Sequence, residues 1–423
     1  MYKNLSIEEL NALKAELSAQ FVALKAKKLS LDMSRGKPCT EQLDLSNAMM
    51  TIDLGNYKTD VGFDCRNYGA LDGINEAKRL LMPMLGVPED CVIIGGNSSL
   101  QLMYDMLVKA LLLGVSEGAK PWSKYEKIKF ICPVPGYDRH FAMLEEFGIE
   151  MINVPMHPDG PDMDLTERIA AEDETVKGIF CVPMYSNPDG FIYSDDAVRR
   201  FANMKTAADD FRIFWDNAYC VHHLSDTPAP LLDIYDECIK AGTEDRLYIF
   251  VSTSKITFAG GGLSAFGSSR KNIDFIRRQL SIQTISFERI NQLRHARFFK
   301  NIDGINEHMK KHRAIIEPKF NAVTELLERE LKPLGLGEWH VPRGGYFISF
   351  NGMNGTAKRT VELCKEAGVI LTGAGATYPY GRDPDDKNIR IAPTFPPIDE
   401  LISAMEVFCA SVKLASAEIL LAK

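Results

Sequence analysis

The sequence lacks a long apolar run and an excess of positive charge. Its richest apolar stretch, Leu107–Val115, is interrupted by Lys109 and is too short to cross a membrane. The formal net charge of -8 argues against a nucleic-acid surface, which would carry a basic patch. We therefore expect neither a membrane partner nor a nucleic-acid partner.

Paired cysteine motifs are also missing. The 9 cysteines are scattered, odd in number, and form no CxxC pair. This pattern indicates reduced thiols in a cytoplasmic protein and argues against a disulfide framework or a zinc site. The N-terminus reads as a charged amphipathic helix without the apolar core of a secretory signal. His222, His223 and His295 have no partners at ligand spacing, so we expect no metal.

The chain of 423 residues is long enough for two domains, and its 45% hydrophobic and 25% charged residues are typical of a soluble globular protein. Ser6 and Glu9 predict a capping box at the start of the first helix. We expect an N-terminal helix and arm (1–48) that joins the small domain, a large domain (49–295) and a small C-terminal domain (296–423).

Strands and helices alternate through the middle of the chain. This alternation favours a mostly parallel sheet covered by helices on both faces. From about residue 290 the pattern changes to a long, broken helical region followed by short strands and a final helix from Ile398. The expected strands are Cys91–Ile94, Lys127–Cys132, Glu150–Val154, Val176–Val182, Phe211–Trp215, Leu247–Val251 and Ser264–Phe266, with later ones near Gly345–Phe350, Val369–Leu371 and Asn388–Ala392.

Polar residues follow the ends of these strands, where ligands gather in parallel sheets. The glycines and hydroxyls of Gly95–Ser99 precede a long helix and predict an anion site, since free backbone N–H groups and the helix dipole point at the ligand. The sequence Gly95–Ser99 matches neither a Walker A nor a GxGxxG motif, so a nucleotide is not implied. Lys255 follows a buried strand and could be a covalent-catalysis lysine, although most such lysines are solvated surface residues.

The motifs occur in this order along the chain: Gly96–Ser99, Tyr137, Asn187–Gly190, Asp216–Tyr219, Ser252–Lys255 and Arg390. Taken in this order, they resemble the motifs of the fold-type I pyridoxal-phosphate (PLP) enzymes of the class I aminotransferase family over residues 30–400. The segment SKITFAGGG around Lys255 resembles the corresponding sequence of the bacterial aspartate aminotransferase subgroup Ic. The resemblance implies an α/β fold, with a mainly parallel seven-stranded sheet between helices in a large domain and a smaller α+β domain. It also implies PLP as cofactor and a homodimer with shared active sites.

The resemblance assigns cofactor roles to particular residues. Lys255 would form a Schiff base with the cofactor and then move the substrate proton. Asp216, otherwise readable as a helix N-cap, would pair with the pyridine nitrogen. The remaining cofactor-binding residues are Tyr219 and Asn187 at the phenolic oxygen, Tyr137 stacked on the ring, Asn97, Ser98, Ser99 and Ser252 at the phosphate, and Tyr68 of the partner subunit.

Substrate binding is expected mainly at Arg390, whose planar fork suits the α-carboxylate. Asn187 and Gly36 would also contact the substrate, although the Gly36 loop reads equally well as a surface turn. For the second carboxylate of an acidic substrate, Arg139 is the first candidate, followed by Arg35 and Lys37 in the Gly36 loop.

One position departs from the wider family. Leu263 stands eight residues after Lys255, where the family has a phosphate-binding arginine. The phosphate charge must then be met by backbone N–H groups, serines or another cation, which the sequence alone does not identify.

The predicted activity is transfer of the amino group of aspartate or another acidic amino acid to 2-oxoglutarate by a ping-pong route. The same residues would also serve an aromatic or kynurenine aminotransferase, a β-lyase or a decarboxylase. A non-catalytic PLP-binding regulator is disfavoured, because it would need an appended DNA-binding module and the chain carries net negative charge.

Overall fold

The computed structural model describes residues 2–422. Its main sheet has eight strands in the order β2-β9-β8-β7-β6-β3-β4-β5. These strands are β2 (Val92–Ile94), β3 (Lys129–Val134), β4 (Glu150–His157), β5 (Gly160–Pro161), β6 (Val176–Cys181), β7 (Arg212–Asp216), β8 (Leu247–Ser252) and β9 (Ser264–Ser268).

The sheet is mainly parallel, as the alternation of elements predicted. β4, β3, β6, β7 and β8 pair in parallel, whereas β9 runs antiparallel to both β8 and β2. The predicted count of seven strands was wrong by one. The additional strand is β5, which adds two residues to the edge of the sheet and pairs antiparallel with β4.

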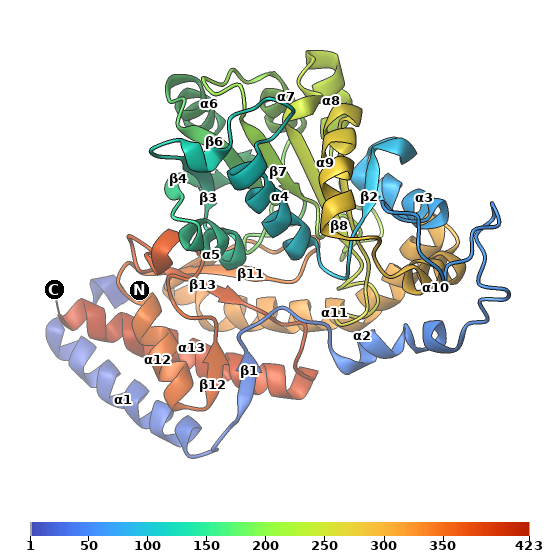
Figure 1. The fold of residues 1–423 in the computed structure, drawn as a ribbon. Coiled ribbons are helices and arrows are strands. Elements are labelled where there is room, and N and C mark those ends of the chain that lie inside the picture. Colours follow the sequence, from blue (N-terminus) through green and yellow to red (C-terminus); the bar gives the residue numbers. More distant parts are fainter. Residues whose placement is uncertain (1, 423) are drawn as a thin grey trace.

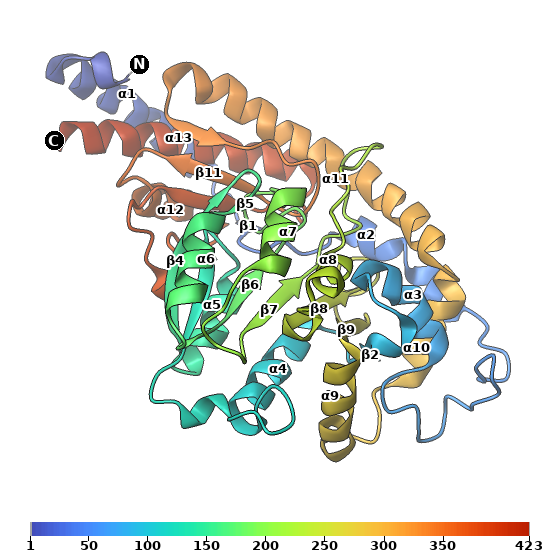
Figure 2. The same ribbon diagram turned by 90° about the horizontal axis from the view of Figure 1, so that it is seen from above.

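Helices lie on both faces of this sheet (Figure 1 and Figure 2). They are α3 (Asn75–Leu85), α4 (Ser99–Leu113), α5 (Asp138–Glu146), α6 (Met163–Glu172), α7 (Asp195–Asn203), α8 (Ile234–Ala241) and α9 (Arg270–Gln283). The central strands are therefore buried on both sides and apolar almost throughout, as a covered parallel sheet requires. Aromatic rings fill the centre: Phe214 lies 5.7 Å from Phe130 and 4.8 Å from Phe180 between ring centroids.

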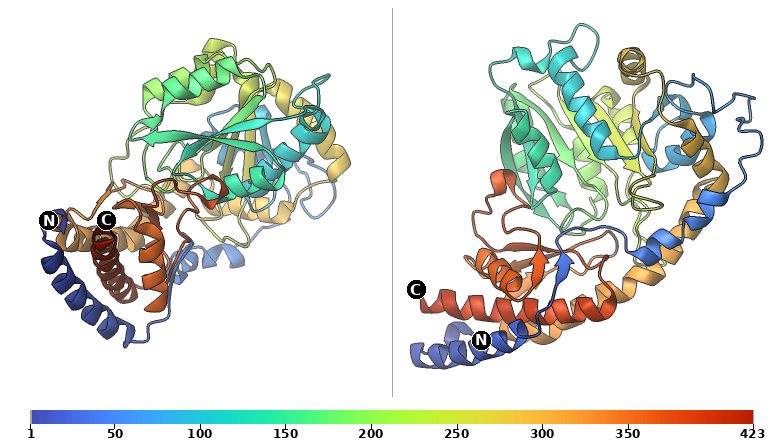
Figure 3. Two further views of the ribbon diagram at one scale, coloured as in Figure 1. Left: turned by 90° about the vertical axis from the view of Figure 1, so that its left-hand side faces the viewer. Right: turned by 60° about the horizontal axis from the view of Figure 1, so that its bottom comes forward.

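A second hydrophobic core forms around long helices and two small sheets. Figure 3 shows the N-terminal α1 alongside the C-terminal α13, and these two helices are in contact. The elements are α1 (Ile7–Lys25), α12 (Ala357–Glu366), α13 (Ile398–Leu421), the sheet β10 (Gly337–Trp339), β11 (Ile348–Gly352), β13 (Asn388–Ile391), and the pair β1 (Leu31–Met33), β12 (Val369–Leu371). The short helix α2 (Thr40–Asp44) contacts α11 (Ile302–Glu330) instead.

The predicted capping box of α1 is confirmed. The Ser6 backbone N–H donates to Glu9 Oε2 at 2.7 Å, and the Glu9 N–H donates to Ser6 Oγ at 3.2 Å. The predicted break in the later helical region is also confirmed. α10 (Arg289–Phe299) and α11 (Ile302–Glu330) are separated at Lys300, whose φ is 67°.

α11 contributes to both hydrophobic cores. Ile305 and Met309 pack in the core of the large sheet, whereas Phe320 and the residues after it pack in the second core. Because one helix serves both cores, the domain boundary expected near residue 296 stays a prediction. Within the described part of the chain, every helix is too short or too polar to span a lipid bilayer.

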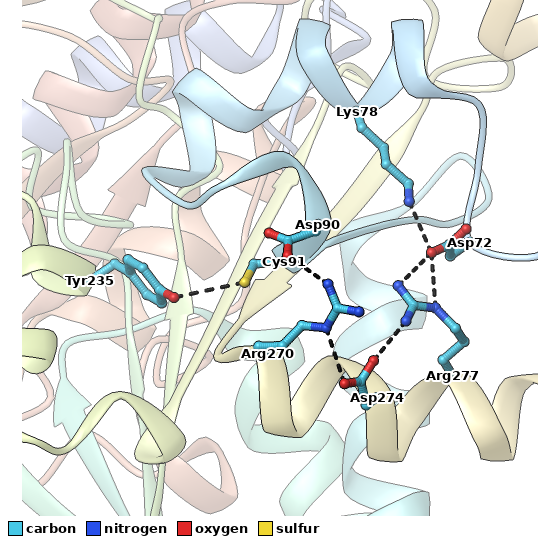
Figure 4. A network of polar contacts seen from close by, with 8 residues as sticks. All are labelled: Asp72, Lys78, Asp90, Cys91, Tyr235, Arg270, Asp274 and Arg277. Atoms are coloured by element: carbon cyan, nitrogen blue, oxygen red, sulfur yellow. Dashed lines mark hydrogen bonds and ion pairs between the residues drawn. The ribbon is translucent and has the colours of Figure 1, made fainter. Parts of the chain in front are cut away.

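A charged network fixes the loop that leads into α3 (Figure 4). Asp72 accepts from Lys78 Nζ at 2.9 Å and from Arg277 Nη2 at 2.7 Å, and Arg277 also contacts Asp274 at 2.7 Å. Burial opposes ionisation of Asp72, but the hydrogen bonds from Lys78 and Arg277 prevail and lower its pKa. The chain just before α3 is therefore tied to α9.

Candidate active site

The carboxyl ends of the parallel strands meet at one edge of the main sheet, and the predicted motifs at Tyr137, Asn187, Asp216 and Lys255 lie at or just after these ends. Asp216 is the last residue of β7, and Lys255 comes three residues after the end of β8. Lys255 lies in a tight turn, because the backbone N–H groups of Ile256 and Thr257 both donate to Thr253 O at 2.8 Å. The edge thus brings the lysine and the aspartate together.

The Lys255 amine lies 5.2 Å from the centre of the Tyr219 ring. Burial lowers the pKa of Lys255, because a charged amine is disfavoured away from water. The positive charge of Arg390 lowers this pKa further, and the negative charge of Asp216 opposes the shift. A lysine with a depressed pKa has more of the neutral form that acts as a nucleophile or base.

Asp216 is buried, and its two carboxylate oxygens differ in their contacts. Oδ2 lies 3.2 Å from His140 Nε2, so an Nε2–H tautomer of the histidine donates to it. Oδ1 is also buried but has no hydrogen-bond partner within residues 2–422. A buried acceptor without a partner is costly, so this oxygen is suited to a donor supplied by a ligand.

His140 was missed by the sequence analysis. Its ring stacks on Phe180 at 4.3 Å and meets Tyr137 edge-on at 4.9 Å. The available signal was its position in α5, one helical turn after Tyr137. Tyr137 itself has its pKa raised to about 12, chiefly by burial and then by the negative charge of Asp216, so its hydroxyl stays protonated.

Arg390 comes from β13 of the small three-stranded sheet and is buried. Its Nη1 donates to Asp138 Oδ1 at 2.8 Å and to Asn187 Oδ1 at 3.2 Å, and its Nη2 donates to Thr372 Oγ1 at 3.4 Å. Its Nε is buried without a partner among the described residues. Arg390 is therefore a fixed cation with a donor left for a carboxylate.

The Gly36 loop lies against the aromatic ring that neighbours Arg390. The guanidinium of Arg390 is 4.8 Å from the Phe347 ring centre, and a methyl group on Gly36 would overlap that ring. A larger residue at Gly36 would displace either the loop or the ring. Arg35 and Lys37, on either side of Gly36, have exposed side chains.

Arg139 is exposed at the start of α5. Its neighbour Asp138 pairs with Arg390, so this end of α5 lies close to the predicted α-carboxylate site. The three candidates for the second carboxylate are thus all at the surface of the single chain.

The predicted phosphate-binding residues lie at the N-terminus of α4 and the end of β8. Ser98 is the N-cap residue of α4, but its side chain makes no capping hydrogen bond, while Ser99 is buried. Asn97 Nδ2 donates to Ala259 O at 3.2 Å, and Ser252 Oγ lies 2.7 Å from Ser254 Oγ. The backbone N–H groups of the first turn of α4 remain available to an anion.

Tyr68 is exposed, whereas Leu263 is buried beside the turn that carries Lys255. Tyr68 is 74% exposed, and within residues 2–422 its side chain makes no polar contact with the other predicted cofactor residues. Leu263 is 2% exposed, and its backbone N–H donates to Thr253 Oγ1 at 2.8 Å.

A half-buried lysine, a buried aspartate at the end of the neighbouring strand and a nearby buried arginine, on this α/β fold, define an aminotransferase-type site. Residues 5–423 match the aspartate amino-transferase family, and the chain belongs to that family. The family predicted from the motifs is therefore confirmed, and the protein is an aminotransferase.

Individual relatives agree with this assignment. An aspartate aminotransferase of Corynebacterium glutamicum is 45% identical over 412 residues, which cover 97% of this chain and 95% of the relative. A crystal structure of an aspartate transaminase from that organism superposes with a TM-score of 0.96 at 44% identity, covering 99% of each chain. The α-aminoadipate aminotransferase LysN of Thermus thermophilus, at 17% identity, a TM-score of 0.74 and coverage of 93% of this chain and 95% of its own, shares the fold.

Proposed function

We propose that this aminotransferase uses PLP to transfer the amino group of aspartate to 2-oxoglutarate by a ping-pong route. The observation that carries the proposal is that two buried atoms near Lys255, Asp216 Oδ1 and Arg390 Nε, both have no hydrogen-bond partner among the described residues. One is an acceptor suited to a protonated ring nitrogen, and the other is a donor suited to a carboxylate. The name of the relative from Corynebacterium glutamicum supports aspartate as the substrate.

The residues present fit this cofactor. Lys255 would bind it covalently, Asp216 would accept from its ring nitrogen, and Tyr219 and Asn187 would contact its phenolic oxygen. Tyr137 would stack on the ring. When bound, the cofactor supplies an electron sink for the negative charge that develops at the substrate Cα.

The residues of the chain would supply the proton transfer and the positioning. Lys255 Nζ, with its lowered pKa, would take the proton from the substrate Cα and deliver it to the cofactor carbon C4′. Arg390 would hold the α-carboxylate, which orients the Cα–H bond toward that amine. His140 would keep Asp216 in place through the contact at Oδ2.

We also propose a homodimer with Tyr68 of the partner subunit at each phosphate, and a cytoplasmic location. All 9 cysteines, each within the described residues, are free thiols. Free thiols in this number are typical of a reducing compartment and support the proposed location.

Replacement of Lys255 by Ala tests the function. We expect the variant to lose transamination by at least about a hundredfold, the usual contribution of a positioned general base. Borohydride reduction should leave the cofactor on the Lys255 peptide of the wild type, and mass spectrometry should find none there in the variant. Lys310→Ala, which removes an exposed lysine that pairs with Glu307, is the matched control.

The substrate is tested by mixing the holoenzyme with aspartate alone. Without an amino acceptor, each active site should release one molecule of oxaloacetate and then stop. Release of pyruvate and ammonia from a cysteine conjugate, without this release of oxaloacetate, would indicate a β-lyase instead.

A further inference from the structure

A cavity of about 620 Å³ lies beside the glycine run that follows Lys255. One wall is the turn before α4, with Gly96 and Asn97, and another is the run from Gly260 to Leu263. A third wall is α10, which contributes Asn291 and Arg294, and the segment with Met49 and Met50 adds a fourth. The cavity therefore joins the N-terminus of α4 to the position where the expected phosphate-binding arginine is absent.

The glycine run is fixed from both sides of this cavity. Asn97 Nδ2 donates to Ala259 O at 3.2 Å from the α4 side. Asn291 Nδ2 donates to Gly261 O at 3.0 Å and to Gly262 O at 3.1 Å from the α10 side. A methyl group on Gly260 would meet nothing within 4 Å, so this part of the run leaves open space instead of packing against a neighbour.

Arg294 is the one basic residue among the described residues that line the cavity. On the same helix, Arg289 donates to Gly69 O at 2.7 Å and Arg297 donates to Lys58 O at 3.2 Å. Arg294, by contrast, has no hydrogen-bond or ion-pair partner within residues 2–422, and its side chain is half-buried.

The carboxylate that shares the cavity does not neutralise this arginine. Glu288 is the N-cap of α10, and both its oxygens accept from the Asn291 N–H at 2.8 Å. The cavity thus holds a guanidinium available to an anion, next to the free N–H groups at the start of α4. An arginine binds phosphate through parallel hydrogen bonds, which suits it to this place.

We propose that Arg294 is the cation that binds the phosphate of the cofactor, in place of the arginine that Leu263 replaces. This inference rests on the proposed use of PLP. Asn291 holds α10 to the glycine run. The positive charge of Arg294 therefore comes from α10 and not from the segment that carries Lys255.

The test compares PLP with pyridoxal, which lacks the phosphate. The affinity of the apoprotein for each is measured by absorbance titration for the wild type and for Arg294→Met. We expect the preference for PLP over pyridoxal to fall by about tenfold to a hundredfold, as loss of a charge-assisted hydrogen bond implies. The affinity for pyridoxal should stay unchanged, which also reports that Lys255 and the fold are intact.

Two further variants sharpen the result. Arg294→Lys keeps the charge without the planar fork and should restore part of the preference. Arg297→Met removes an exposed arginine one turn along α10 and should leave both affinities unchanged.

The inference is overturned if Arg294→Met keeps the wild-type preference for PLP, or if it weakens pyridoxal binding to the same extent. Failure of the proposed function gives a different result, since the wild type would then bind neither compound through Lys255. Wild-type binding of PLP with an unaffected Arg294→Met variant rejects the role of Arg294 alone.

Discussion

Asp189 is a buried carboxyl group two residues after Asn187, and burial raises its pKa to about 7. A carboxyl group whose pKa is higher in the folded than in the unfolded chain stabilises the fold only while it is protonated. Its contribution is complete below the unfolded pKa near 3.8 and is lost as pH rises toward 7. The loss amounts to about 1.4 kcal/mol for each pH unit in this window.

Asp189→Asn should remove this dependence, because the amide stays neutral. We expect the variant and the wild type to have similar free energies of unfolding near pH 4, and the variant to be the more stable one near pH 7. Urea unfolding at several pH values between these limits measures the difference. A constant difference across the window would contradict the raised pKa.

Arg139 is the first candidate to bind the second carboxylate of an acidic substrate, and in this role it would set the specificity for acidic over neutral amino acids. Arg139→Ala should raise KM for aspartate by about tenfold or more and leave KM for alanine nearly unchanged, since only aspartate has the carboxylate that loses its partner. Arg278→Ala, which removes an exposed arginine of α9 that pairs with Glu117, is the matched control. Equal losses for both amino acids would show that Arg139 is not the side-chain clamp.

At the level of residues, the sequence predicted those that lie in family motifs, including Arg390 on the second sheet, and missed those whose contacts depend on packing. Lys255 and Asp216 could be named because the ordered motifs that contain them resemble those of the aminotransferase family. His140 and Asp138 could not, because their contacts with Asp216 and Arg390 exist only once α5 packs against the sheet. Arg294 was missed for the same reason, as α10 reaches the glycine run only in three dimensions.

At the level of elements, the N-terminus of α1 depends on its capping box. Ser6→Ala removes the acceptor for the Glu9 N–H and should lower the free energy of unfolding by about 1 kcal/mol. Chemical denaturation measures the change. Ser18→Ala is the control, because Ser18 lies inside α1 and donates only to Lys14 O. A loss as large in the control would rule out a special role for the cap.

The strands that sequence patterns predicted well are those buried on both faces, since continuous apolar runs mark them. β5 carried no such signal, because it consists of only Gly160 and Pro161. The strand expected at Gly345–Phe350 begins later, at Ile348. Gly345 instead adopts a φ of 83° and packs against Tyr185, a contact between distant segments that periodicity does not encode.

At the level of the whole molecule, Tyr68 is displayed on an anchored loop. Arg289 donates to Gly69 O at 2.7 Å and also to Asn67 O, and Asp72 is held by the ion pairs of Figure 4. The tyrosine between these anchors is nevertheless 74% exposed. An exposed aromatic residue on a fixed loop is suited to a contact with a second copy of the chain.

Mixed dimers test this contact. Tyr68→Ala and Lys255→Ala should each be poorly active alone, because each spoils both sites of its own homodimer. Co-expressed, they should form a heterodimer in which one site has an intact lysine from one chain and an intact tyrosine from the other. Activity above the sum of the two variants is the expected result, and the absence of any recovery would place Tyr68 outside its partner's site.

The nine thiols have a further consequence. Eight of them are buried and only Cys220 is partly accessible, so an alkylating reagent reaches most of them only when the chain opens locally. Cys132 and Cys181 lie in the core of the large sheet, and Cys364 and Cys409 lie in the core around α13. The protein therefore contains natural reporters whose alkylation rates compare the opening of one core with that of the other, without any introduced label.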